Sequence, residues 1–175
     1  MKAVRDLATL LVKNNLLVQY GGGDVGLMGH LADTVLENKG KIRGIIPEFM
    51  VKEGWIHSEV QDMEIVETMS ERKRIIMTDT DGIIALAGGF GTLEELSEAI
   101  TLKQLGLINV PIIILNTNGF YDELFSFFRR MSTENLIREE YHKIWREVKL
   151  PGEVLPQLLN TPTWDSNQAR KRAAI

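Results

Sequence analysis

Two glycine-rich segments carry most of the residues in this sequence whose types and spacing could do chemistry. Residues 21–29 read GGGDVGLMG and residues 87–95 read AGGFGTLEE, and each follows an apolar run and precedes a helical pattern. Glycine lets a backbone turn sharply and approach a ligand closely, and a helix that begins there offers N–H groups and a positive dipole end. Tight turns between a strand and a helix also use glycine without any ligand, and this reading stays open for the first segment.

The second segment adds a hydroxyl group to the same backbone physics. Gly88, Gly89 and Gly91 can present amides to a phosphate, and Thr92 follows them with a hydroxyl donor. Because both segments come at the ends of predicted strands, a shared role in binding a phosphorylated ligand is favoured over two unrelated structural turns.

Two charged residues near these segments are candidates for catalysis. Glu95 stands three residues after Thr92, as in a capping box, yet its carboxylate could equally serve as a general base or a ribose contact. Arg72 lies near the start of a predicted helix, in the sequence ERKR at 71–74. It is either part of a solvated basic turn or a contact to a phosphate or leaving group, since a guanidinium binds oxyanions in a planar fork.

The elements that must position these residues alternate along the chain. Apolar runs predict strands at 16–20, 41–46, 62–66, 82–87, 110–115 and 143–148. Helical spacing predicts helices at 4–13, 25–38, 69–80 and 120–131, and another between the second glycine segment and about 105. The helix at 69–80 is also predicted from the sequence TMSE at 68–71, which matches a capping box from Thr68 to Glu71. The alternation predicts a Rossmann-like doubly wound parallel sheet between two helix layers, in a three-layer α/β/α arrangement. We expect one nucleotide-binding α/β domain over 1–175, with 166–175 as a frayed tail.

Composition narrows the classes of partner. The chain has 175 residues, a net charge of -4 and a pI near 5.5, which argues against non-specific nucleic-acid binding. It has no cysteine, and its three histidines share no ligand spacing, so we expect no metal site. Neither a membrane span nor a secretory signal is predicted, and a cytoplasmic location is expected.

The motifs together resemble the LONELY GUY family, often labelled lysine decarboxylases. The resemblance rests on YGGGDVGLMG at 20–29, ERK at 71–73 and GGFGTLEE at 88–95, and covers about 7–148. It implies a Rossmann-like homodimer that hydrolyses a cytokinin riboside 5′-monophosphate or AMP to free base and ribose 5-phosphate, without a cofactor. By the resemblance, Arg72 and Glu95 are the catalytic pair. The residues that it assigns to substrate binding are Gly22, Gly23, Met28, Lys73, Gly88, Gly89, Gly91 and Thr92.

The sequence departs from the family pattern in two places. The family has proline where this chain has Ala87, and proline would stiffen that turn. Family members also begin with a strand that ends in a phosphate-contacting Gly-Ser turn, whereas this chain starts in the helix that should follow. We expect the strands at 16–20 and 82–87 to lack their common neighbour, unless the sheet has closed across the gap.

Three other functions compete with hydrolysis. A nicotinamide-dependent oxidoreductase would use Gly21, Gly23 and Gly26 as a dinucleotide fingerprint, but the acidic residue it needs, Glu48, comes slightly late. A non-catalytic nucleotide-binding or carrier protein is the second alternative. Lysine decarboxylation is disfavoured because no lysine stands near either glycine segment, Lys73 being the nearest by motif.

Overall fold

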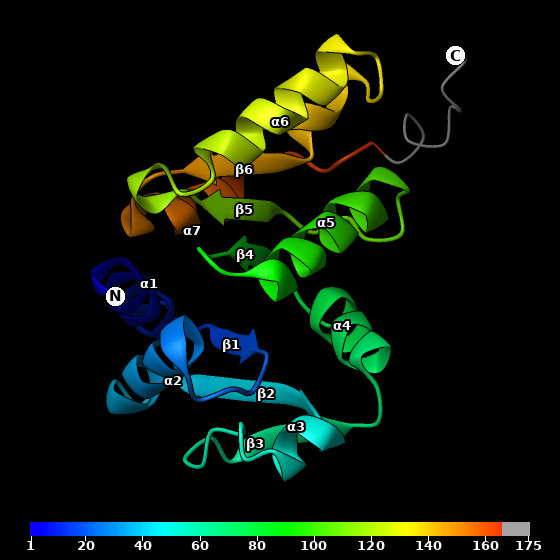
Figure 1. The fold of residues 1–175 in the computed structure, drawn as a ribbon. Coiled ribbons are helices and arrows are strands. Elements are labelled where there is room, and N and C mark those ends of the chain that lie inside the picture. Colours follow the sequence, from blue (N-terminus) through cyan, green and yellow to red (C-terminus); the bar gives the residue numbers. More distant parts are fainter. Residues whose placement is uncertain (166–175) are drawn as a thin grey trace. The chain divides into compact units, whose positions relative to one another are not determined.

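The computed structural model describes residues 1–165, and the frayed tail expected at 166–175 lies outside the described residues. The chain forms two compact units, Met1–Thr80 and a second that begins at Asp81 (Figure 1). The expectation of a single domain stays a prediction. The α/β class is confirmed, because every sheet is parallel and flanked by helices.

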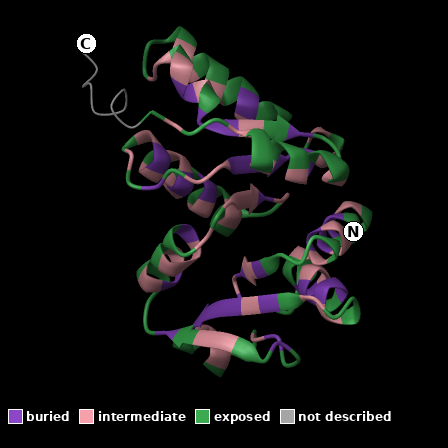
Figure 2. Cartoon of the chain, turned by 180° about the vertical axis from the view of Figure 1, so that it is seen from behind, coloured by how far each residue is buried: buried purple, intermediate pink, exposed green. Residues whose placement is uncertain are grey.

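The first unit holds a three-stranded parallel sheet with strand order β1-β2-β3. Its elements are α1 (Lys2–Lys13), β1 (Leu17–Tyr20), α2 (Gly26–Glu37), β2 (Lys41–Pro47), α3 (Glu48–Lys52), β3 (Asp62–Val66) and α4 (Met69–Thr78). The central strand β2 is buried from Gly44 onward, and Figure 2 shows it as the longest buried stretch of this unit. Apolar residues at helical spacing bury one side of α1, which packs on α2.

Alternating side chains of β1 face helices on opposite sides of the sheet. Gln19 donates to the carbonyl oxygens of Ile75 and Asp79 at the end of α4, at 3.4 and 3.3 Å. Its neighbours Val18 and Tyr20 are buried on the other face. Burial raises the pKa of Tyr20, and the charges of Asp24 and of Asp33 on α2 raise it further. The first unit is therefore three layers deep.

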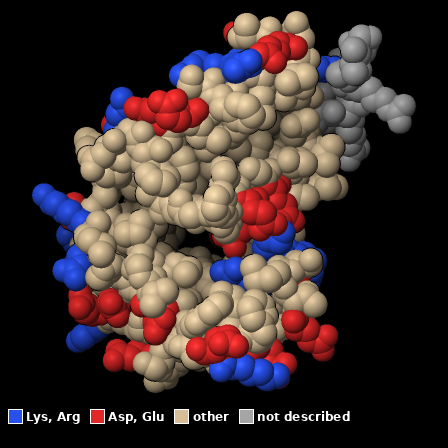
Figure 3. Space-filling view, viewed as in Figure 1, with Lys and Arg blue, Asp and Glu red and all other residues tan. Residues whose placement is uncertain are grey.

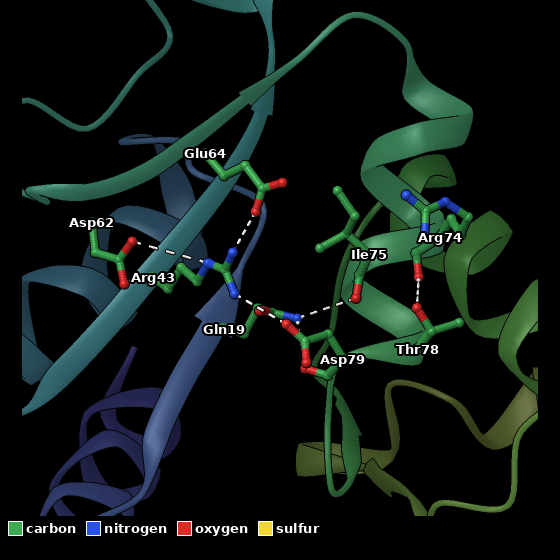
Figure 4. A network of polar contacts seen from close by, with 8 residues as sticks. All are labelled: Gln19, Arg43, Asp62, Glu64, Arg74, Ile75, Thr78 and Asp79. Atoms are coloured by element: carbon green, nitrogen blue, oxygen red, sulfur yellow. Dashed lines mark hydrogen bonds and ion pairs between the residues drawn. The ribbon is translucent and has the colours of Figure 1, made fainter.

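An arginine on the central strand ties the sheet to α4. Arg43 forms ion pairs with Asp62 and Glu64 of β3 (Figure 4). Its Nη1 also lies 3.1 Å from Oδ2 of Asp79, the residue at the C-cap of α4. The pairs with Glu64 and Asp79 join two elements that flank β2, and Gln19 reaches the same end of α4. This network fixes where α4 lies on the sheet, and hence where the side chains of its first turn lie.

The second unit holds another three-stranded parallel sheet, of order β4-β5-β6. Its elements are β4 (Ile83–Ala85), α5 (Phe90–Gln104), β5 (Ile112–Leu115), the 3-10 turn η1 (Thr117–Gly119), α6 (Asp122–Thr133), the 3-10 turn η2 (Glu139–Lys143), β6 (Trp145–Val148) and α7 (Pro151–Asn160). All four residues of β5 are buried, as expected for a central strand. Helix α6 packs on β6 through the rings of Phe128 and Trp145, whose centroids are 5.1 Å apart, and α7 packs against β5 and β6.

The strands β1 and β4, expected to lack their common neighbour, are each an edge strand of their sheet, which agrees with that expectation. Most of the other predicted elements are present, and two details differ. The five-residue helix α3 was not predicted, because Pro47 was interpreted only as a strand end. The predicted capping box of α4 is shifted by one residue: Thr68 Oγ1 accepts from the amide of Glu71, but the Glu71 carboxylate accepts from the amide of Glu67.

The surface carries charges of both signs. On the face drawn in Figure 3, acidic and basic side chains are interspersed, and apolar or neutral residues cover the area between them. Among residues 1–165, no helix is both long enough and apolar enough to cross a bilayer.

Candidate functional site

The first glycine segment forms the turn between β1 and α2, and a neighbouring strand-like segment holds it. Gly23 pairs with Ile56 in an antiparallel bridge, in which the amide of His57 donates to Gly22 O at 2.9 Å and that of Asp24 to Trp55 O at 3.2 Å. Gly22 has φ +77°, which favours glycine, and a Cβ there would lie 2.9 Å from Ile46 Cβ. The turn is therefore fixed by backbone contacts, which explains its glycine content in part without a ligand.

Arg72 is buried at the carboxyl ends of β1 and β2, with 7% of its surface exposed. Its Nε donates to Ile45 O at 3.1 Å and its Nη2 donates to Gly21 O at 3.3 Å. The interpretation of Arg72 as part of a solvated basic turn is therefore wrong, whereas Arg74 of the same turn is exposed. The cation is tolerated near a helix start because backbone carbonyls, not solvent alone, face its charge.

The site residues predicted in the first unit lie close together. A Cβ on Gly21 would overlap Arg72 Nη2, so the glycine leaves the space that the guanidinium fills. The thioether of Met28 lies over the same turn, since a Cβ on Gly23 would be 2.8 Å from Met28 Cε. Gly22, Gly23, Met28 and Arg72 thus share one region, and their predicted roles in binding and catalysis stay predictions. Lys73 follows Arg72 on α4 and is half-buried.

The second glycine segment forms the N-terminal turn of α5. The helix begins at Phe90, with Gly89 as its N-cap and no side-chain hydrogen bond to the cap. The first α-helical bond runs from the amide of Leu93 to Gly89 O at 3.1 Å, so the amides of Phe90, Gly91 and Thr92 precede the hydrogen-bonded helix. No atom of residues 1–165 is recorded within 4 Å of a Cβ built on Gly89 or Gly91. This turn has the geometry of an anion site.

The capping box predicted from Thr92 to Glu95 is wrong. The N-cap is Gly89, so Thr92 is the third residue of the helix, not its cap. The Thr92 side chain folds back over Gly88, where a Cβ would overlap its hydroxyl oxygen, and so reaches toward the helix start. Glu95 lies one turn further on, half-buried, on the helical face it shares with Thr92. The capping alternative for Glu95 is therefore excluded, and its role in catalysis stays a prediction.

Two buried side chains that support the glycine turns were not found from the sequence. His57 Nε2 lies 3.2 Å from Asp33 Oδ1 of α2, and its Nδ1 accepts from the amide of Glu59, so His57 holds the segment that clamps the first turn. In the second unit the Tyr121 hydroxyl donates to Leu86 O, just before the second turn. An isolated histidine or tyrosine gives no pattern, and only the fold reveals these contacts.

Two other places in the structure, a cavity in the second unit and the end of β2, can be compared with the glycine turns as candidate sites. A cavity of about 1190 Å³ in the second unit lies among α6, η2 and β6, and no predicted site residue lines it. Glu48 opens α3 and forms an exposed ion pair with Lys52 instead of ending β2, where an oxidoreductase needs its ribose-binding acid. Among residues 1–165, no group of three or more histidine or acidic side chains is placed to hold a metal ion.

Comparison with known proteins agrees with this architecture. Residues 28–158 match the protein family described as possible lysine decarboxylase. The chain is 39% identical over 156 residues to the probable cytokinin riboside 5′-monophosphate phosphoribohydrolase LOGL1 of Oryza sativa subsp. japonica, covering 89% of this chain and 70% of the relative. It is 38% identical over 157 residues to the phosphoribohydrolase LOG2 of Arabidopsis thaliana, covering 90% and 72%.

Solved structures show the same fold at lower identity. The molybdenum cofactor binding protein of Rippkaea orientalis superposes with a TM-score of 0.67 at 21% identity, over 91% of this chain and 87% of that one. The molybdenum cofactor carrier protein of Chlamydomonas reinhardtii gives a TM-score of 0.66 at 19% identity, over 90% and 86%.

The parallel sheets, their flanking helices and the glycine turns define a Rossmann-like α/β protein. Within that class, sequence identity over most of the chain decides the family. The chain belongs to the LONELY GUY family, whose curated members include the two plant phosphoribohydrolases above.

Proposed function

We propose that this chain hydrolyses the N-glycosidic bond of a nucleoside 5′-monophosphate, AMP or a cytokinin riboside monophosphate, giving the free base and ribose 5-phosphate. The observation that carries the proposal is the N-terminal turn of α5. Its cap is a glycine, the space beside Gly89 and Gly91 is open, and the Thr92 hydroxyl reaches back toward the same turn. Amides, a hydroxyl and a helix dipole suit a phosphate monoester. The names of the plant relatives support the reaction.

Arg72 and Glu95 are the proposed catalytic residues. As the glycosidic bond breaks, positive charge develops on the ribose and negative charge on the departing base. The Glu95 carboxylate stabilises the sugar cation and orients the attacking water, which adds to C1′ while the base leaves with a proton. The Arg72 guanidinium, held by the carbonyls of Ile45 and Gly21, offsets negative charge on the phosphate or base. Gly22, Gly23, Met28 and Lys73 are the proposed contacts to the nucleoside.

The proposal also includes the oligomeric state and the cellular location of the enzyme. A homodimer in the cytoplasm is supported by the resemblance of the motifs to the family. Light scattering on purified protein tests the dimer, and a monomer at micromolar concentration would contradict it.

A matched pair of variants at Gly89 tests the phosphate site. Gly89→Asp adds a side chain where nothing lies within 4 Å, at an N-cap position where aspartate is favoured, so the variant should fold as well as wild type. Its carboxylate faces the anion, so the Kd for AMP in calorimetry should rise at least ~100-fold. Gly89→Asn has the same shape and capping preference without the charge, and should bind AMP within about tenfold of wild type.

The outcome separates the competing functions. Equal AMP binding by wild type and Gly89→Asp would place the anion elsewhere. Chromatography of wild type incubated with AMP distinguishes hydrolysis from binding alone. Free base and ribose 5-phosphate support hydrolysis, and intact bound AMP supports a non-catalytic nucleotide-binding protein. If neither the products nor bound AMP are found, both functions are rejected.

A further inference from the structure

A buried hydroxyl binds the chain just before the second glycine turn. Tyr121 has only 4% of its surface exposed, and its hydroxyl donates to Leu86 O at 2.5 Å. Leu86 follows β4 and stands two residues before Gly88. Burial raises the pKa of Tyr121, so the hydroxyl stays a donor through the physiological range.

The backbone of Tyr121 is itself held by a fully satisfied buried amide. Asn116, with 0% of its surface exposed, accepts from the amide of Tyr121 at 2.7 Å through its side-chain oxygen. The Asn116 side-chain nitrogen donates to Asp122 and to Glu147 of β6, each at 2.7 Å. Every hydrogen-bonding atom of this amide is therefore used, and the position of Tyr121 is set by β6 and α6 together.

The glycines of the turn have no side chains with which to hold it in place. Gly89 and Gly91 have open space beside them, and glycine has more backbone freedom than any other residue. The hydrogen bond to Leu86 O restrains the chain immediately before this glycine-rich stretch. An anion site made of backbone amides works only if those amides are held in place before the ligand arrives.

We propose that Tyr121 is a positioning residue of the phosphate site, which acts through Leu86 to hold the turn at 87–91 in its anion-binding conformation. This inference rests on the proposed function, in which that turn binds the phosphate of the substrate. Tyr121 does not touch the substrate in this role. Its effect is on binding, because the amides of the turn itself contact the phosphate in this role, whereas Glu95 lies one turn further along α5 and Arg72 lies on α4.

The variant Tyr121→Phe removes one oxygen and keeps the ring that contacts Phe120 and Phe125. The Kd for AMP and the Kd for inorganic phosphate should both rise about tenfold, as expected for one lost hydrogen bond in a preorganised turn. In turnover the KM for AMP should rise by the same factor, and kcat should stay within about threefold. Tyr141→Phe is the matched control, because Tyr141 is also buried in the same unit but its ring contacts Trp164.

Hydrogen exchange of the free protein tests the positioning without any ligand. Amides at 88–92 should exchange faster in Tyr121→Phe than in wild type and Tyr141→Phe, while amides at 21–24 should not change. A failure of AMP hydrolysis with faster exchange at 88–92 would overturn the proposed function and leave the positioning role standing. Unchanged exchange at 88–92, or a lower melting temperature with the same Kd for phosphate, would reduce Tyr121 to a packing residue.

Discussion

Replacing Gly21 by alanine should damage the candidate site through Arg72. The backbone of Gly21 is outside the left-handed region, so alanine can adopt its conformation. The added Cβ would overlap Arg72 Nη2 and stand 3.1 Å from its Cζ, with Met28 Sδ at 3.4 Å on another side. The guanidinium must therefore move, although it is buried and bonded to Ile45 O and Gly21 O.

The magnitude follows from those two hydrogen bonds. A hydrogen bond from a charged group contributes roughly 1.5–3 kcal/mol, and a displaced guanidinium loses at least one of the two, so the free energy of unfolding should fall by at least about 1.5–3 kcal/mol. If Arg72 is catalytic, turnover of AMP should fall by ~100-fold or more under conditions where the variant is folded. Urea denaturation followed by circular dichroism and an assay of base release measure the two effects.

A control variant and a double variant test whether Gly21 acts through Arg72. Gly152→Ala on α7 adds a methyl group where nothing lies within 4 Å, so stability should be unchanged or raised by up to ~1 kcal/mol, with normal turnover. In an Arg72→Ala background, Gly21→Ala should cost under ~0.5 kcal/mol, because the overlap is gone. Wild-type stability and turnover in Gly21→Ala, or an equal cost in both backgrounds, would show that Gly21 does not make room for the guanidinium.

Two further predictions concern Glu95 and Lys103. Glu95→Gln should leave stability and the Kd for AMP nearly unchanged and lower kcat by ~100-fold or more, the scale of one acid–base group; full activity would remove Glu95 from the mechanism. Burial, then the charge of Arg146, lowers the pKa of Lys103 to about 8 from 10.5. The unfolded state then binds more protons above pH 8, so the free energy of unfolding should rise with pH up to ~10, where the raised pKa values of Tyr20 and Tyr121 reverse the trend. Lys103→Met should flatten that rise in urea midpoints measured at pH 7 to 10, and an unchanged slope would contradict this origin.

Local patterns were enough to predict the elements and the place of the glycine turns. Apolar runs such as that of β5 and helical spacing such as that of α1 reflect burial, which depends on the sequence within a few residues. The Thr68 cap of α4 was predicted for the same reason, since its bond to Glu71 spans one turn. The resemblance of the motifs to the family then indicated Arg72 and Glu95 as candidate catalytic residues.

The roles of those residues depend on contacts that a local pattern does not contain. Arg72 bonds to carbonyls 27 and 51 residues away, and Tyr121 to one 35 residues away, so their partners are decided only when strands of the same sheet meet. The start of α5 illustrates the same limit at short range. A capping box at Thr92 and a glycine cap at Gly89 are both compatible with the sequence, and the tertiary structure selects Gly89, because the helix reaches back to the end of its strand and folds Thr92 over Gly88.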